Sequence, residues 1–108
     1  MRDVQKEIGE LVRGEKVVLF MKGTPLAPKC GFSATVCRIL DGKGVNFRAV
    51  DVLADPEVRD GVKAYANWPT VPQLYIGGEF VGGCDIAKEL DASGELEGLL
   101  RKAGVSAS

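Results

Sequence analysis

The chain has 108 residues, the common size of a single domain, and 45% of them are hydrophobic, so we expect one domain over residues 1–108 with one core. Its formal net charge is −1, which gives no broad electrostatic basis for binding nucleic acid or an anionic membrane. Histidine is absent, and this excludes Ser-His-Asp triads, Cys-His nucleophile pairs and every metal site that requires imidazole.

The first half of the chain predicts two helices and two strands. Apolar residues recur at helical spacing after Asp3, which predicts a first helix with Asp3 as its N-cap and Gly14 at its end. Val17–Met21 is an uninterrupted apolar run, the pattern of a strand buried on both faces. A second helix is predicted from Cys30 onward, and Asn46–Val52 alternates like a strand. The expected apolar face of this second helix comprises Phe32, Val36, Ile39 and Leu40.

The next segment predicts a third helix and a hairpin. Asp55 as N-cap and Pro56 at the first helical position are typical of a helix start. Two apolar runs, Gln73–Ile76 and Glu79–Val81, then flank Gly77-Gly78. Because glycine tolerates positive φ at both central positions, this pair predicts a two-residue hairpin turn.

Two closing helices complete the predicted order. Asp85 is expected to cap the first of them, and apolar spacing over Glu95–Ala103 predicts the second. Strand, helix and strand in the first half form a right-handed parallel unit. A helix leading into such a unit, followed by a helix, an antiparallel hairpin and closing helices, is the order of the thioredoxin fold. We therefore expect an α/β protein with a four-stranded mixed sheet flanked by helices.

Cys30 is the candidate reactive residue. It follows a buried strand and a proline-containing loop and stands at the beginning of a helix, where unpaired amides and the helix macrodipole favour an anion. Neighbouring lysines also lower the pKa of a thiol. Lys29 adjoins Cys30, and Lys22 is placed to fold back toward it. Cysteine is commonly a small buried apolar residue, but these flanks favour a thiolate.

The segment Cys30-Gly31-Phe32-Ser33 carries a hydroxyl where dithiol oxidoreductases place a resolving cysteine. An intramolecular disulfide between Cys30 and a second cysteine of this motif is therefore excluded. Cys37 cannot substitute, because seven residues along a helix separate it from Cys30 by about 10.5 Å, beyond the ~7 Å Cα limit for a disulfide. We expect Cys37 to be a packing residue.

The sequence also favours a reducing compartment. Three cysteines, an odd number, do not suit the paired framework of a small secreted protein. The first 13 residues include Asp3, Glu7 and Glu10, unlike a signal or transit peptide. No apolar run approaches the ~20 residues that cross a bilayer. We expect a soluble, cytoplasmic protein with neither a membrane nor a nucleic acid as partner.

Four motifs follow one another at suitable spacing along most of the chain. They are Met21-Lys22-Gly23-Thr24-Pro25, Cys30-Gly31-Phe32-Ser33, Trp68-Pro69-Thr70-Val71-Pro72-Gln73 and Gly82-Gly83-Cys84-Asp85. Together they resemble the CGFS-type monothiol glutaredoxins, whereas the CGFS tetrapeptide alone would be a weak signal. The resemblance implies a groove for glutathione, a tripeptide with two carboxylates and one ammonium.

The resemblance also implies roles for five groove residues. Lys22 and Arg59 would pair with the glycyl carboxylate of glutathione. Val71, the residue before the family's cis-proline, would bind the peptide-like middle through its backbone. The backbone amides of Cys84 and Asp85 would receive the γ-glutamyl carboxylate, and the Asp85 carboxylate would meet the ammonium.

A 2Fe-2S cluster is the cofactor that the resemblance implies beside glutathione. Such a cluster needs four thiolate ligands, and this chain has no cysteine-rich run to supply them. The resemblance implies that two chains each give Cys30 and two glutathiones each give a thiolate, which makes the loaded form a homodimer. It further implies a BolA-like partner and apo iron-sulfur proteins as recipients. Because we expect Cys84 in an exposed loop, a redox partnership between Cys84 and Cys30 stays open.

Two other functions stay open beside cluster carriage. In a glutathione-dependent thiol-disulfide oxidoreductase, Cys30 would attack a mixed disulfide and a second glutathione would resolve it. The loop Gly23–Lys29, however, resembles an extra family segment that is expected to displace glutathione from a geometry suited to rapid exchange. The third possibility is a protein that only binds other proteins, but this function would give no role to Lys22 and Cys30. We therefore expect mainly a cluster carrier, and at most a weak oxidoreductase.

Overall fold

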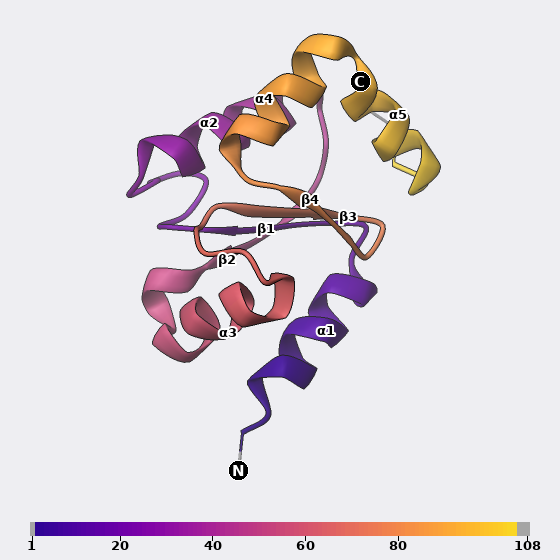
Figure 1. Ribbon diagram of the computed structural model, residues 1–108. Coiled ribbons are helices and arrows are strands. Elements are labelled where there is room, and N and C mark those ends of the chain that lie inside the picture. Colours follow the sequence, from indigo (N-terminus) through magenta and orange to yellow (C-terminus); the bar gives the residue numbers. More distant parts are fainter. Residues whose placement is uncertain (1, 106–108) are drawn as a thin grey trace.

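The computed structural model describes residues 2–105, which form a four-stranded mixed sheet with helices on both faces (Figure 1). The elements, in chain order, are α1 (Val4–Gly14), β1 (Val17–Met21), α2 (Gly31–Gly42), β2 (Arg48–Asp51), η1 (Val52–Ala54), α3 (Pro56–Ala66), β3 (Gln73–Ile76), β4 (Glu79–Gly82), α4 (Cys84–Ser93) and α5 (Glu95–Lys102). The strand order is β2-β1-β3-β4. The predicted thioredoxin fold is confirmed.

Strand β1 lies at the centre of the molecule. It pairs parallel to β2, with Met21 opposite Asp51, and antiparallel to β3, with Leu19 opposite Leu74. All five residues of β1 are buried, as its uninterrupted apolar run predicts. Alternate side chains enter two cores, because successive residues of a strand point to opposite faces. In Figure 1, α2, α4 and α5 cover one face of the sheet, and α1 and α3 cover the other.

Side-chain caps and glycine turns define the predicted boundaries. The Asp3 carboxylate accepts a hydrogen bond from the Lys6 amide at 3.1 Å, which starts α1, and Asp55 caps α3. Gly77 and Gly78 have φ angles of +62° and +82°, as the predicted hairpin turn requires.

Several boundaries differ from the sequence prediction: β4 extends to Gly82, α5 ends at Lys102, and the other differences concern β2 and α4. Strand β2 covers only Arg48–Asp51 of the predicted Asn46–Val52, and it ends where the Asp51 carboxylate accepts the Leu53 amide at 2.9 Å and begins the short helix η1. Helix α4 begins at Cys84, with Gly83 as its N-cap, so Asp85 lies in the first turn and is not the cap. Gly82, the last residue of β4, has a φ of +149°, and a Cβ there would lie 2.6 Å from Ile86 Cβ, so glycine is required where β4 leads into α4.

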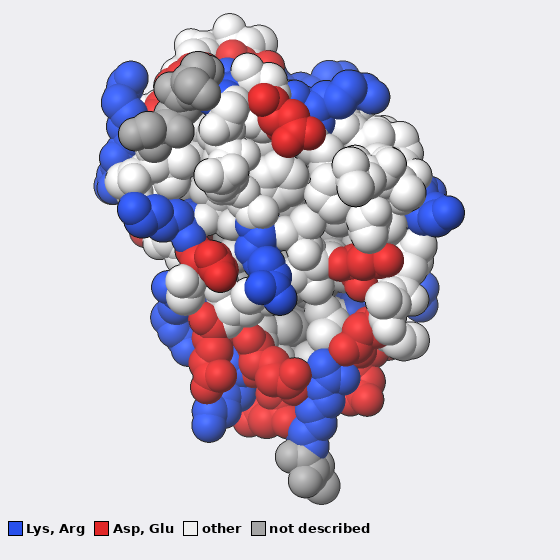
Figure 2. Space-filling view, turned by 180° about the vertical axis from the view of Figure 1, so that it is seen from behind, with Lys and Arg blue, Asp and Glu red and all other residues white. Residues whose placement is uncertain are grey.

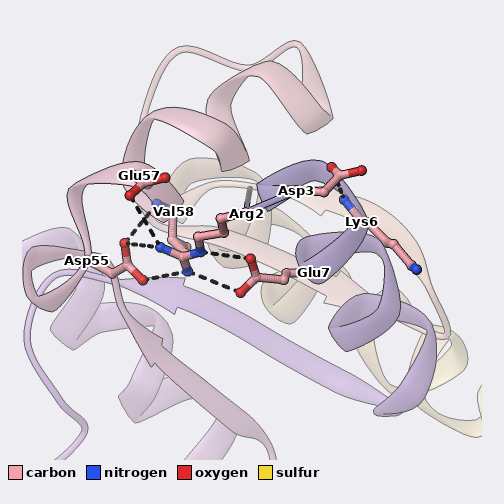
Figure 3. A network of polar contacts seen from close by, with 7 residues as sticks. All are labelled: Arg2, Asp3, Lys6, Glu7, Asp55, Glu57 and Val58. Carbon is pink, nitrogen blue, oxygen red and sulfur yellow. Dashed lines mark hydrogen bonds and ion pairs between the residues drawn. The ribbon is translucent and has the colours of Figure 1, made fainter.

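Helix α3 is fastened to the N-terminal segment. Arg2 donates to Glu7 at 2.7 Å and to Asp55 at 2.8 Å, and its hydrogen bonds lower the pKa of Asp55 (Figure 3). The helices approach so closely at Gly61 that a Cβ there would lie 2.5 Å from Val4 Cγ1. This close packing fixes α3, the helix that carries Arg59, against α1.

Charges of both signs cover the outer surface of this helix pair. Seen from behind, acidic side chains gather over the part of the molecule formed by α1 and α3, with basic side chains beside them (Figure 2). Among residues 2–105, no helix combines the length and apolar character required to cross a membrane.

Candidate functional site

A groove of about 530 Å³ opens beside the start of α2. All six residues singled out from the sequence line it: Lys22, Cys30, Arg59, Val71, Cys84 and Asp85. They come from five separated parts of the chain, namely the end of β1, the start of α2, helix α3, the segment before β3 and the start of α4. The fold therefore gathers into one site the residues that the motifs place far apart in sequence.

Cys30 is the N-cap of α2, and its half-buried side chain lines the groove. The pKa of this thiol is lowered, first by the backbone amide of Ser33, and also by the amide of Phe32, the Ser33 hydroxyl and the positive charge of Lys22. Partial burial opposes these effects without cancelling them. These groups all favour the charged form, so the site stabilises a thiolate as a helix N-terminus should.

The hydroxyl of Ser33 joins the two elements that meet at Cys30. Ser33 is fully buried, and its Oγ accepts a hydrogen bond from the Lys22 amide at 3.1 Å. The residue in the resolving position of a dithiol motif therefore ties the end of β1 to the start of α2. It also leaves its own proton available to the Cys30 sulfur.

The loop from Gly23 to Lys29 is held closed at its base. Gly23 has a φ of +85°, and a Cβ there would lie 2.6 Å from the Ala27 carbonyl oxygen and from the Lys29 nitrogen. The Asp51 carboxylate accepts the Gly23 amide at 2.9 Å, and the Lys29 amide donates to the Lys22 carbonyl at 2.9 Å. Only glycine fits this turn, so the approach to Cys30 has a defined shape.

The other two cysteines are buried. Cys37 is 3% exposed, its sulfur lies 3.6 Å from the Met21 sulfur, and burial raises the pKa of its thiol. It is a packing residue, as predicted. Cys84 is 9% exposed, so the expectation of an exposed loop position is wrong. The thiol packs into the core because Cys84 is the first residue of α4 and its side chain faces the sheet.

The charged residues approach the groove from opposite sides. Arg59 lies on α3 and Asp85 on α4, and these helices cover opposite faces of the sheet (Figure 1). Lys22 follows the central strand between them. A ligand lying across the groove therefore meets cations toward one end and a carboxylate toward the other.

Sequence reasoning missed three residues that line the groove: Lys63, Phe32 and Ile86, the last of which directly follows the fourth motif. Lys63 lies one helical turn after Arg59, and this i, i+4 spacing could have placed it on the same face of α3. Phe32 was expected to pack inward, but it is 64% exposed. Its turn of α2 borders the groove rather than the core, which apolar spacing alone does not reveal.

The thiol environments predict which cysteine reacts first. Below neutral pH, iodoacetamide should modify Cys30 before Cys37, because the pKa of Cys30 is lowered and that of Cys37 is raised. Cys84 should be protected by burial. Peptide mass mapping after short exposures across a pH series gives the order. Faster modification of Cys37 or Cys84 would count against the assignment of Cys30 as the reactive thiol.

The fold and the groove define a thioredoxin-fold protein with a single accessible, acidified thiol at a helix N-terminus. The glutaredoxin family model matches residues 17–81. A Synechocystis protein named "uncharacterized monothiol glutaredoxin ycf64-like" is 52% identical over 101 residues, with 94% of each chain covered. Yeast mitochondrial monothiol glutaredoxin-5 is 48% identical over 94% of this chain and 69% of its own length.

Solved structures agree with these sequence relatives. A monomeric truncated mutant of 1-C-Grx1 from Trypanosoma brucei superimposes with a TM-score of 0.88 at 42% identity, covering 99% of this chain and 97% of its own. The chain therefore belongs to the glutaredoxin family, and its relatives at about half identity are monothiol glutaredoxins. The resemblance inferred from the four motifs is confirmed.

Proposed function

We propose that this chain binds glutathione and carries a 2Fe-2S cluster, bridged between two subunits by Cys30 and glutathione. The observation that carries the proposal is the contrast among the three thiols. Cys30 is acidified and accessible in a charged groove, whereas Cys37 and Cys84 are buried. Each chain thus offers one thiolate to a ligand.

The charged residues that line the groove suit the two carboxylates and the ammonium of glutathione. Lys22 and Arg59 would hold the glycyl carboxylate by charge-assisted hydrogen bonds. Val71, which precedes a cis peptide bond to Pro72, would pair with the peptide-like middle. The amides at the start of α4, at Cys84 and Asp85, would receive the γ-glutamyl carboxylate, and the Asp85 side chain would meet the ammonium.

The ligand count of the cluster supports a homodimer. A 2Fe-2S cluster is held by four thiolates. One chain contributes Cys30, since Cys37 is enclosed in the core and Cys84, although it lines the groove, is only 9% exposed. Two chains and two glutathione thiolates complete the set, and the cluster is then a cargo that can leave when the dimer opens.

We propose apo iron-sulfur proteins as recipients, because they accept the cargo, and a BolA-like protein as a further partner, which the family resemblance implies. We place the protein in the cytoplasm, where thiols stay reduced, although some of its relatives are mitochondrial. Neither nucleic acid nor a membrane belongs to the proposed function.

The second candidate is glutathione-dependent reduction of mixed disulfides, and the low pKa of the accessible Cys30 thiol favours it. The thiolate would attack the glutathione sulfur, release the protein thiol and form a disulfide with glutathione. A second glutathione thiolate would then free Cys30 and leave as glutathione disulfide. The loop from Gly23 to Lys29, closed by backbone hydrogen bonds, resembles the extra family segment that is expected to displace glutathione from a geometry suited to rapid exchange, and we therefore rank this activity second.

Two rates, one measured on the cluster-loaded form of the protein and one on the cluster-free form, separate the two candidate functions. The cluster-loaded protein should transfer its cluster promptly to an apo-ferredoxin, as followed by circular dichroism. The cluster-free protein should reduce a glutathionylated peptide only slowly. Rapid deglutathionylation together with no transferable cluster would favour the oxidoreductase.

A further inference from the structure

The segment Trp68–Pro72, here called the groove wall, is held from beneath by a buried glutamine. All five of its residues line the groove. Gln73 is fully buried behind it, and its Nε2 donates to the carbonyl oxygens of Trp68 and Thr70, each at 3.2 Å. One side chain therefore anchors two carbonyls of a segment that belongs to no helix or strand.

Both ends of the Gln73 side-chain amide have partners. The carbonyls of Trp68 and Thr70 can only accept, so they require the amide nitrogen on the side of the groove wall, and the Tyr75 hydroxyl donates to Gln73 Oε1 at 3.0 Å at the other end. Burial raises the pKa of the Tyr75 hydroxyl, which keeps it protonated as a donor. The ring of Tyr75 also contacts that of Phe80, which in turn contacts that of Trp68, with centroids 5.4 Å apart in both pairs.

The hydrogen bond to Thr70 determines where the Val71 amide points. The Thr70 carbonyl and the Val71 N–H belong to one trans peptide, whose two polar groups point in opposite directions. Because Gln73 draws the carbonyl toward the core, the N–H is directed away from the core. Within residues 2–105 this N–H has no protein acceptor, and Val71 lines the groove.

We infer that Gln73 is a positioning residue that aims the Val71 amide at the ligand from beneath the groove wall, with the Tyr75 hydroxyl holding the oxygen end of its side chain. The inference rests on the proposed binding of glutathione, whose peptide-like middle takes that amide. The side chain of Gln73 touches no ligand. It acts through the peptide between Thr70 and Val71.

The test compares Gln73→Met, which keeps the length of the side chain but removes its donors, with Tyr75→Phe, which removes only the hydroxyl that holds the oxygen end. Tyr65→Phe is the matched control, because its ring also contacts Tyr75 but its hydroxyl makes no hydrogen bond to Gln73. Trp68 is the only tryptophan of the chain, so its fluorescence and quenching by acrylamide report directly on the groove wall. The amide resonance of Val71 in a ¹⁵N spectrum reports on the inferred hydrogen-bond geometry.

Without glutathione, Gln73→Met should shift the Val71 resonance and increase quenching of Trp68, and the control should match wild type. Glutathione should bind about threefold to tenfold more weakly, a loss that corresponds to the free energy of one hydrogen bond. The pH profile of Cys30 alkylation should not move, because the groups that acidify the thiol are untouched. Tyr75→Phe should change the same signals in the same direction but less, and it decides the matter if Gln73→Met does not fold.

Unchanged Trp68 and Val71 signals in both variants would overturn the inference. Shifted signals with wild-type glutathione affinity would also overturn it, because the groove wall would then move without affecting the ligand. If wild type itself binds no glutathione, the proposed function fails. The ligand-free signals would still show whether Gln73 holds the groove wall.

Discussion

We expect Cys30→Ser to abolish assembly of the 2Fe-2S cluster, even with iron, sulfide and glutathione in excess. The hydroxyl of serine is not ionised near neutral pH and is a poor substitute for a thiolate ligand. No other thiol of the chain can take over, since Cys37 and Cys84 are buried. The visible absorption of the reconstituted protein measures the loss.

The control for this change is Cys37→Ala, which removes a buried thiol that lies against Met21. This variant should lose some stability to a small cavity but keep its cluster. Wild-type protein reconstituted without glutathione should fail as Cys30→Ser does, because two of the four ligands are then missing. A stable cluster in either of these failing cases would refute the proposed ligation.

Lys22→Ala should weaken glutathione binding by roughly tenfold to a hundredfold, since a hydrogen bond to a charged group contributes about 1.5 to 3 kcal/mol. Lys22 lines the groove, and its charge is one of the groups that lower the pKa of Cys30. The variant should therefore also shift alkylation of Cys30 toward higher pH. Isothermal titration with glutathione and a pH series of alkylation measure the two effects.

Lys29→Ala is the matched control for Lys22→Ala. Lys29 adjoins Cys30 in sequence, but it does not line the groove and is not among the groups that acidify the thiol. Its backbone amide, which closes the loop on Lys22, is unaffected by the substitution. Equal losses of glutathione affinity in the two variants would indicate a general effect of positive charge, and the specific anchor at Lys22 would be wrong.

Local signals in the sequence predicted the helices and strands, and they also predicted that the site residues lie together in one groove. Five consecutive apolar residues predicted β1, the capping aspartates Asp3 and Asp55 predicted α1 and α3, and two glycines predicted the hairpin. These features succeed because each is set by backbone geometry or by burial within a few residues. The motifs then predicted the groove, since their order along the chain implies a fold that brings them together.

The misses arise where tertiary contacts decide the outcome. Helical spacing assigned Phe32 to the core, but its turn of α2 borders the groove. Cys84 was expected to be exposed, but it is the first residue of α4 and packs into a core cluster. Gln73 stood in a quoted motif without a role, because no local pattern shows that its amide is buried against two carbonyls.

Anaerobic reconstitution of the wild-type protein with iron, sulfide and glutathione tests the central claim most directly. Visible absorption, molecular size in solution and the glutathione content of the same sample are measured together. We predict a 2Fe-2S spectrum in a fraction of dimer size that contains one cluster and two glutathiones for every two chains. A cluster held by a monomer, or a dimeric cluster without glutathione, would contradict the account.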